Sequence, residues 1–200
     1  MRTEDPPQGY QEENTRRLFL HLPRTVVMIG MMGVGKTVIG QQLAAYLQVP
    51  FFDSDAAVEA LFGCTVYDFF SRYGENAFRE SERKIVANLL AGPVCVLASG
   101  GGAFMDPQTR AVIKAQAVSV WLKASLDLLI YRTTKRIENT RPLLLQGNPR
   151  TVLSRLLKER SPIYNTADII IESQDDPCES IVERIATALT HHFDYSVEAF

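Results

Sequence analysis

The stretch that decides the fold is Val26-Val27-Met28-Ile29-Gly30-Met31-Met32-Gly33-Val34-Gly35-Lys36-Thr37. Its first four residues are apolar, as is typical of a buried strand. The next eight match the pattern G-x-x-x-x-G-K-T, and apolar residues with helical spacing follow as far as Leu47. A strand, a glycine-rich loop and a helix in this order are the context in which the pattern forms a phosphate-binding loop.

The residue types of this loop indicate its chemistry. Glycines let successive backbone N–H groups turn inward and form a nest for phosphate oxygens, and the N-terminus of the following helix adds partial positive charge. We therefore expect Gly33, Val34 and Gly35 to contact nucleotide phosphates. Lys36 can reach the outer phosphates, and the hydroxyl of Thr37 can bind Mg²⁺.

Composition narrows the class of protein. The 200 residues suit one domain, and 46% hydrophobic residues are ordinary for a globular core. A net charge of −2 argues against a nucleic-acid partner but leaves room for a local basic site for an anionic small molecule. No run of 18 apolar residues occurs, so we expect no membrane-spanning helix and no membrane partner.

Features outside the loop predict the compartment. The polar first residues do not resemble a signal peptide. Cys64, Cys95 and Cys178 are scattered and lack metal-ligand spacing, which favours a reducing cytoplasm. The sequence does not determine the oligomeric state; we expect a monomer.

Short apolar strands alternate with helices along the chain. This pattern predicts an α/β fold with a five-stranded parallel sheet between two helical layers. The domain should span residues 24–192, between a flexible tail at 1–23 and a second tail at 193–200, with a polar, mobile lid at about 137–150. Strands are expected at 25–29, 51–53, 94–98, 118–122 and 169–171, and helices at 36–47, 56–62, 66–73, 75–90, 107–114, 125–136, 151–160 and 177–191.

Two aspartates follow the second expected strand. If that strand continues, Asp53 and Asp55 share a face. The strand ending at Ala98 is followed by Ser99 and glycines, whereas many P-loop proteins carry a Mg²⁺-binding aspartate at the end of a core strand. We therefore expect Asp53 near the metal and Asp55 near a substrate hydroxyl; the alternative is an ordinary surface turn.

Glycines and arginines supply further candidates. Three glycines after Ser99 allow a ligand to approach the backbone closely, although they could also form a simple hinge. Arg79, Arg141 and Arg160 are candidate anion-binding residues, and each could equally be a solvated surface residue.

Taken together and in order, these segments resemble the shikimate kinase family from about Thr25 to His191. The resemblance rests on the P-loop and on Phe51-Phe52-Asp53-Ser54-Asp55, Tyr73-Gly74-Glu75, Phe78-Arg79-Glu80-Ser81-Glu82, Ser99-Gly100-Gly101-Gly102, Arg141-Pro142-Leu143-Leu144 and Arg160-Ser161-Pro162-Ile163-Tyr164. It implies the strand order 2-3-1-4-5. It also implies phosphorylation of the 3-hydroxyl of shikimate by ATP with Mg²⁺, a step of aromatic amino acid biosynthesis.

The resemblance also implies residue roles at the phosphoryl-transfer end. Lys36 would bridge the phosphates, and Thr37 and Asp53 would serve Mg²⁺. Arg141 would fold with the lid onto the transferring phosphate, and Arg132 would pack against adenine. A lid suits this chemistry because closure excludes water, which competes with the acceptor hydroxyl.

At the acceptor end, Asp55 would hold shikimate hydroxyls and help to deprotonate one of them. Arg79 and Arg160 would hold the carboxylate, with Gly101 and Gly102 lining the pocket. A gluconate kinase of the same superfamily is the nearest alternative, but it should lack this combination of arginines and glycines. A non-catalytic nucleotide-binding module is a second alternative, although it could have lost Asp55 or Arg141.

Overall fold

Five parallel strands form one sheet in the order β2-β3-β1-β4-β5, which confirms the expected fold and strand order. The computed structural model describes residues 22–135 and 147–197. The strands are β1 (Thr25–Ile29), β2 (Phe51–Asp53), β3 (Val96–Ala98), β4 (Ala117–Lys123) and β5 (Ile169–Glu172). The expected tail before residue 22, Arg141 and most of the expected lid lie outside the described residues.

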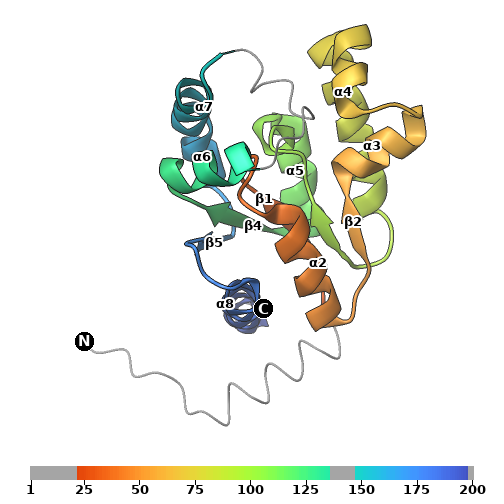
Figure 1. The fold of residues 1–200 in the computed structure, drawn as a ribbon. Helices are drawn as coiled ribbons and strands as arrows, with labels where there is room; N and C mark the ends of the chain where they lie inside the picture. The colour runs from red at the N-terminus through yellow and green to blue at the C-terminus, as the bar shows by residue number, and fades with distance from the viewer. Residues whose placement is uncertain (1–21, 136–146, 198–200) are drawn as a thin grey trace.

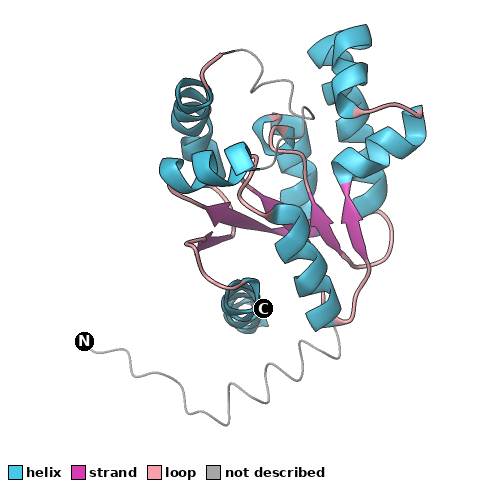
Figure 2. Cartoon of the chain, viewed as in Figure 1, coloured by secondary structure: helices cyan, strands magenta, loops and turns pink. Residues whose placement is uncertain are grey.

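The helices lie on both sides of the sheet (Figures 1 and 2). Helices α2 and α8 pack together on one face, and α5 packs on β4 from the other. Within the described residues, no helix has the length and apolar character needed to cross a membrane. The helices are α2 (Lys36–Leu47), α3 (Ser54–Phe62), α4 (Val66–Leu90), the short 3₁₀ helix η1 (Ala103–Met105), α5 (Pro107–Gln116), α6 (Leu126–Lys135), α7 (Pro149–Tyr164) and α8 (Cys178–Val197).

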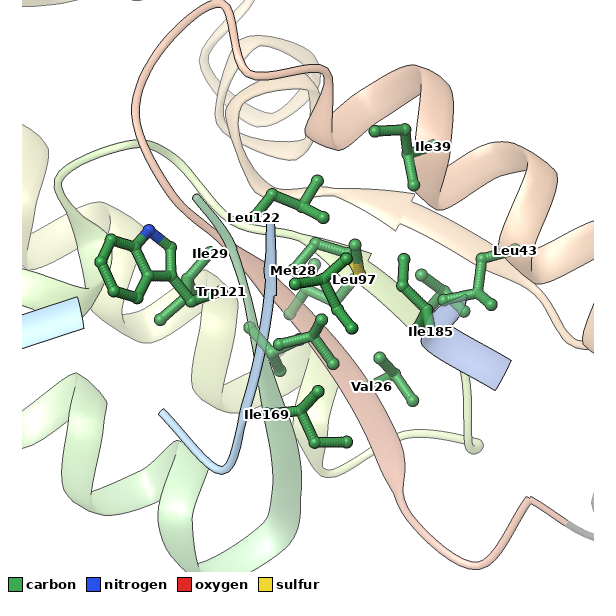
Figure 3. Close-up of a cluster of buried hydrophobic side chains, with 14 of the residues drawn as sticks. Val26, Met28, Ile29, Ile39, Leu43, Leu97, Trp121, Leu122, Ile169 and Ile185 are labelled. Atoms are coloured by element: carbon green, nitrogen blue, oxygen red, sulfur yellow. The ribbon is translucent and has the colours of Figure 1, made fainter. Parts of the chain in front are cut away.

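The core forms around β1, all of whose residues are buried. Because helices cover both faces of the sheet, β1 continues after Thr25 as an unbroken apolar run rather than an alternating one. Figure 3 shows Val26 and Met28 beside Leu43 of α2 and Ile185 of α8. Each such buried side chain contributes roughly 1.5–3 kcal/mol of hydrophobic stabilisation, so the start of the P-loop is held on a rigid strand.

The expected strand at 51–53 is confirmed, but the expected start of the following helix at residue 56 is wrong. Helix α3 begins at Ser54, directly after β2, so Asp55 lies in the first helical turn and not on a continuing strand. The side chain of Asp53 caps this helix by accepting hydrogen bonds from the backbone N–H groups of Asp55 and Ala56. Such a cap satisfies N–H groups that have no partner within the helix, which is why the strand ends there.

The bounds of two later helices also differ from those expected. Helix α7 begins at Pro149, inside the expected lid, and continues through Pro162. The N–H of Asn165 donates to the carbonyl of Ser161 (2.9 Å), so the last turn closes despite the proline. Helix α8 continues to Val197, beyond its expected end at residue 191, because no glycine or proline interrupts it.

Helix α4 combines two expected helices. Thr65 caps its start, as expected, and Gly74 lies in the left-handed region (φ 78°, ψ 173°) and kinks it where we expected a break.

Candidate functional site

A cavity of about 500 Å³ lies beyond the carboxyl ends of β1, β2 and β3. Parallel pairing places Asp53 opposite Ala98, so the segments after β2 and β3 meet at one edge of the sheet, where α/β folds bind ligands. Of the expected site residues, the cavity is lined by Gly33, Gly35, Lys36, Thr37, Asp53, Asp55, Arg79, Gly101, Gly102, Arg132 and Arg160.

The P-loop leads from β1 into α2 through left-handed glycines. Gly33 (φ 83°) and Gly35 (φ 104°) have backbone conformations that other residues rarely adopt. The ammonium of Lys36 donates to the carbonyls of Gly30 (3.0 Å) and Met31 (3.1 Å), and so folds back across the loop. Val34 is fully buried and does not line the cavity.

Thr37 and Asp53 form the candidate Mg²⁺ site. The hydroxyl of Thr37 donates to Oδ2 of Asp53 at 2.9 Å, while Oδ1 of Asp53 caps α3. Mg²⁺ prefers oxygen ligands and is usually held by one or two carboxylates together with substrate phosphates and water. The described ranges contain no cluster of three acidic, histidine or cysteine side chains that could hold a metal alone. The pair therefore fits a Mg²⁺ ion that arrives with phosphates.

Asp55 lines the cavity from the first turn of α3. Burial, together with the negative charges of Glu82 and Asp53, raises the pKa of its carboxyl to about 7, against the opposing effect of Lys36 and Arg79. A carboxylate whose pKa lies near neutrality can accept a proton from a substrate hydroxyl at physiological pH.

Arg79 comes from α4 and lies against the glycine turn. Its guanidinium forms ion pairs with Glu82 (2.6 Å) and Glu75 (3.4 Å), and lies over the ring of Phe78. A Cβ atom at Gly102 would come within 2.4 Å of Nη2 of Arg79, so only glycine leaves room for this guanidinium.

Arg160 reaches the same turn from α7. Its side chain is buried, and Nη1 donates to the carbonyl of Gly101 at 2.7 Å. The hydroxyl of Tyr164 donates to the same carbonyl. From the other side, the N–H of Gly100 donates to the hydroxyl of Ser54 (2.8 Å). The glycine turn is thus held by hydrogen bonds to side chains from two helices, α3 and α7.

Glu82 is a site residue to which the sequence analysis assigned no role. It is 2% exposed, and its Oε1 has no hydrogen-bond partner among the described residues. Burial raises the pKa of its carboxyl, although Arg79 acts in the opposite direction. A Cβ atom at Gly100 would lie 2.2 Å from Oε1 of Glu82 and 2.6 Å from Oδ1 of Asp55, so both carboxylates face this glycine. The i, i+3 spacing of Arg79 and Glu82 was the available signal.

Arg132 closes the opposite end of the cavity. Its guanidinium donates to the carbonyls of Val34 (3.1 Å) and Gln174 (2.9 Å), and to the hydroxyl of Ser173 (3.2 Å). It therefore connects α6 to the P-loop and to the segment between β5 and α8.

Known proteins match this chain closely. The family model described as shikimate kinase matches residues 32–190. The shikimate kinase of Paramagnetospirillum magneticum is 50% identical over 94% of this chain and 96% of its own length, and that of Bradyrhizobium diazoefficiens is 47% identical over 84% and 81%.

Solved structures agree. The shikimate kinase of Acinetobacter baumannii, solved in complex with shikimate, superimposes with a TM-score of 0.80 at 32% identity, covering 86% of this chain and 94% of its own. A gluconokinase of Sinorhizobium meliloti has a TM-score of 0.62 at 17% identity, covering 89% of this chain and 98% of its own, and shares the fold alone.

Proposed function

The chain belongs to the shikimate kinase family, and we propose from this membership and the geometry of the cavity that it transfers the γ-phosphoryl group of ATP to the 3-hydroxyl of shikimate. The single observation that carries the proposal is the convergence of Arg79 and Arg160 on the glycine turn beside Asp55, in the cavity that the P-loop also lines. This arrangement supplies cations for an acceptor carboxylate, a base for a hydroxyl and a nest for phosphates.

At the acceptor end, we assign the carboxylate of shikimate to Arg79 and Arg160. Guanidinium groups pair with carboxylates through two parallel N–H···O bonds, which fix orientation as well as adding energy. Gly101 and Gly102 leave space for the ring beside these arginines. This orientation presents a ring hydroxyl to Asp55.

In the transfer step, a bond forms between the 3-oxygen of shikimate and the γ-phosphorus, and the bond from that phosphorus to the bridging oxygen of ATP breaks. Asp55 accepts the proton of the hydroxyl, which its pKa of about 7 permits. Most of the catalysis comes from positioning and charge neutralisation, as in other phosphoryl transfers.

At the donor end, Gly33, Val34 and Gly35 supply the backbone of the phosphate nest, and Lys36 neutralises the outer phosphates. Thr37 and Asp53 hold Mg²⁺, which contributes charge neutralisation when bound.

Two further arginines complete the donor side. Arg132 packs against adenine, consistent with its place at the far end of the cavity. Arg141, on the lid at about residues 137–150, contacts the transferring phosphate after closure; this role rests on the family's motif.

We further propose that the chain works as a monomer in the cytoplasm, without nucleic-acid or membrane partners. The slightly acidic net charge of −2 and the three free cysteines support this. Light scattering during size-exclusion chromatography tests the monomer.

A coupled assay of ADP release tests the function. Shikimate, gluconate and nucleoside monophosphates are compared as acceptors at equal concentration, with Lys36→Ala as the control for contaminating kinases. We expect turnover with shikimate alone, and the phosphorylated product identified at the 3-position. Faster turnover with gluconate would contradict the proposal, and ADP release without any acceptor dependence would indicate a nucleotide hydrolase.

A further inference from the structure

We propose that Tyr164 is a positioning residue for acceptor binding: its hydroxyl orients the guanidinium of Arg160 and the glycine turn toward the acceptor's carboxylate. The inference deepens the proposed function and rests on it. The observation behind it is that one backbone carbonyl, that of Gly101, accepts hydrogen bonds from both Tyr164 and Arg160.

The hydroxyl of Tyr164 is held in place by its own surroundings. The side chain is 1% exposed, and its ring packs against Trp121 (5.8 Å between centroids) and Phe104 (6.5 Å). Trp121 belongs to β4, which pairs with the central strand β1, and is buried. A ring locked in this way gives its hydroxyl a defined position, and burial of the group raises its pKa, so the hydroxyl remains protonated and a donor.

The shared carbonyl restrains Arg160. Arg160 and Tyr164 are four residues apart on α7, so they lie on the same face of the helix. A carbonyl oxygen has two lone pairs, and here Tyr164 and Arg160 both donate to it. One N–H of the Arg160 guanidinium donates to the carbonyl of Gly101, which sets the orientation of the planar group. The remaining N–H groups stay available to a ligand in the cavity that Arg160 lines.

The same restraint extends to Gly102. The peptide unit between Gly101 and Gly102 is planar and trans, so fixing the Gly101 carbonyl also fixes the direction of the Gly102 N–H. Gly102 in turn lies against Arg79. Tyr164 therefore influences both arginines assigned to the carboxylate, and it does not itself line the cavity.

The variant Tyr164→Phe removes the hydroxyl and keeps the ring. We expect kcat/KM for shikimate to fall about 5–20-fold, the effect of losing one buried hydrogen bond that orients a charged group. The loss should appear in KM for shikimate, with kcat and KM for ATP changed less than about twofold. With the methyl ester of shikimate, which lacks the carboxylate charge, Tyr164→Phe should lower kcat/KM by less than about twofold.

The control is Ser161→Ala, which removes a hydroxyl from the same turn of α7. That hydroxyl donates to the carbonyl of Leu157 within the helix and not to the glycine turn. In Ser161→Ala, we expect the ratio of kcat/KM for shikimate to kcat/KM for its methyl ester to equal that of the parent enzyme. A general loss of stability would lower the reaction of acid and ester alike, so the ratio isolates positioning from folding.

Unchanged KM for shikimate in Tyr164→Phe, or an equal loss with acid and ester, would overturn the inference while leaving the proposed function intact. A parent enzyme that does not phosphorylate shikimate would instead overturn the function, and with it the carboxylate role of Arg160. In an Arg160→Lys background we expect Tyr164→Phe to lose most of its effect; full additivity would show that the two side chains act independently.

Discussion

The hydroxyl of Thr37 donates a 2.9 Å hydrogen bond to the carboxylate of Asp53, and so joins the first turn of α2 to the end of β2. β3 separates β2 from β1 in the sheet, so tertiary structure brings these residues together across the intervening strand. The pair offers two hard oxygen ligands beside the phosphate nest.

Asp53→Asn tests this pair. The amide keeps the shape but loses the charge that attracts the metal. We expect the Mg²⁺ concentration for half-maximal activity to rise about tenfold or more. Asp127→Asn, an exposed change on α6, is the matched control and should leave the Mg²⁺ dependence unchanged. An unaltered dependence in Asp53→Asn would place the metal elsewhere.

Lys36→Ala should abolish transfer. The ammonium neutralises charge that moves during the reaction, and its loss should reduce kcat by about 100-fold or more, several kcal/mol of transition-state stabilisation. Lys84→Ala, which removes an exposed lysine from α4, should retain parental activity. More than a tenth of the parent's turnover in Lys36→Ala would refute the role.

Asp55→Asn should stop turnover and leave ATP affinity nearly intact, while making the ligand-free protein more stable at high pH. The pKa of Asp55 is about 7 in the folded state against an ordinary 3.8, so the folded protein binds more protons than the unfolded chain between these values. Stability therefore falls as pH rises from about 4 to about 7, and the full cost, roughly 2–4 kcal/mol, applies above pH 7.

Removing the titrating group of Asp55 removes this cost. Melting temperatures without Mg²⁺ and nucleotide should show Asp55→Asn above the parent by at least about 4 °C at pH 8, with no gain at pH 4. An equal shift at both pH values would show that the effect does not come from ionisation. ATP affinity that falls in parallel with turnover would assign Asp55 to the metal site.

Gly102→Ala should weaken acceptor binding selectively. The backbone at Gly102 (φ −107°, ψ −12°) accepts alanine, so the cost comes from the new Cβ, which would lie 2.4 Å from Nη2 of Arg79 and displace that guanidinium. We expect KM for shikimate to rise about tenfold with KM for ATP unchanged. In an Arg79→Ala background the same change should add little, because the displaced group is already gone; a further tenfold rise there would contradict this explanation.

Arg141→Lys should lower kcat at least about tenfold, far more than it raises KM for shikimate, because a lysine meets phosphate oxygens as a point charge and cannot reproduce the bidentate fork. Arg150→Lys is the matched control. Its guanidinium pairs with Asp127 at the surface, and the change should leave kcat unaltered. An unchanged kcat in Arg141→Lys would show that the lid only covers the site.

The P-loop could be identified from the sequence because it is a local pattern, and the strand order followed from the family resemblance. Glycines that adopt left-handed conformations, an apolar run before them and a helical period after them are properties of neighbouring residues. The family's ordered motifs then extended the same local reading to Asp53, Asp55, Arg79 and Arg160.

Local patterns do not determine where α3 begins and α7 ends; the tertiary structure decides these positions. Helix α3 begins directly after Asp53, whose side chain caps it, so Asp55 lies in a helical turn rather than on the face of a continuing strand. Pro162 suggested the end of α7, yet the helix continues to Tyr164. The ring of Tyr164 is buried against β4, and its hydroxyl donates to the carbonyl of Gly101.

Glu82 and Tyr164 show the physical reason. Both were visible in the motifs, but their roles depend on burial and on partners distant in sequence: Glu82 faces Gly100 and Asp55, and Tyr164 shares the carbonyl of Gly101 with Arg160. Spacing along a chain encodes helices, strands and turns, whereas the pKa of a carboxyl and the orientation of a guanidinium are set by atoms that folding brings together from separate elements.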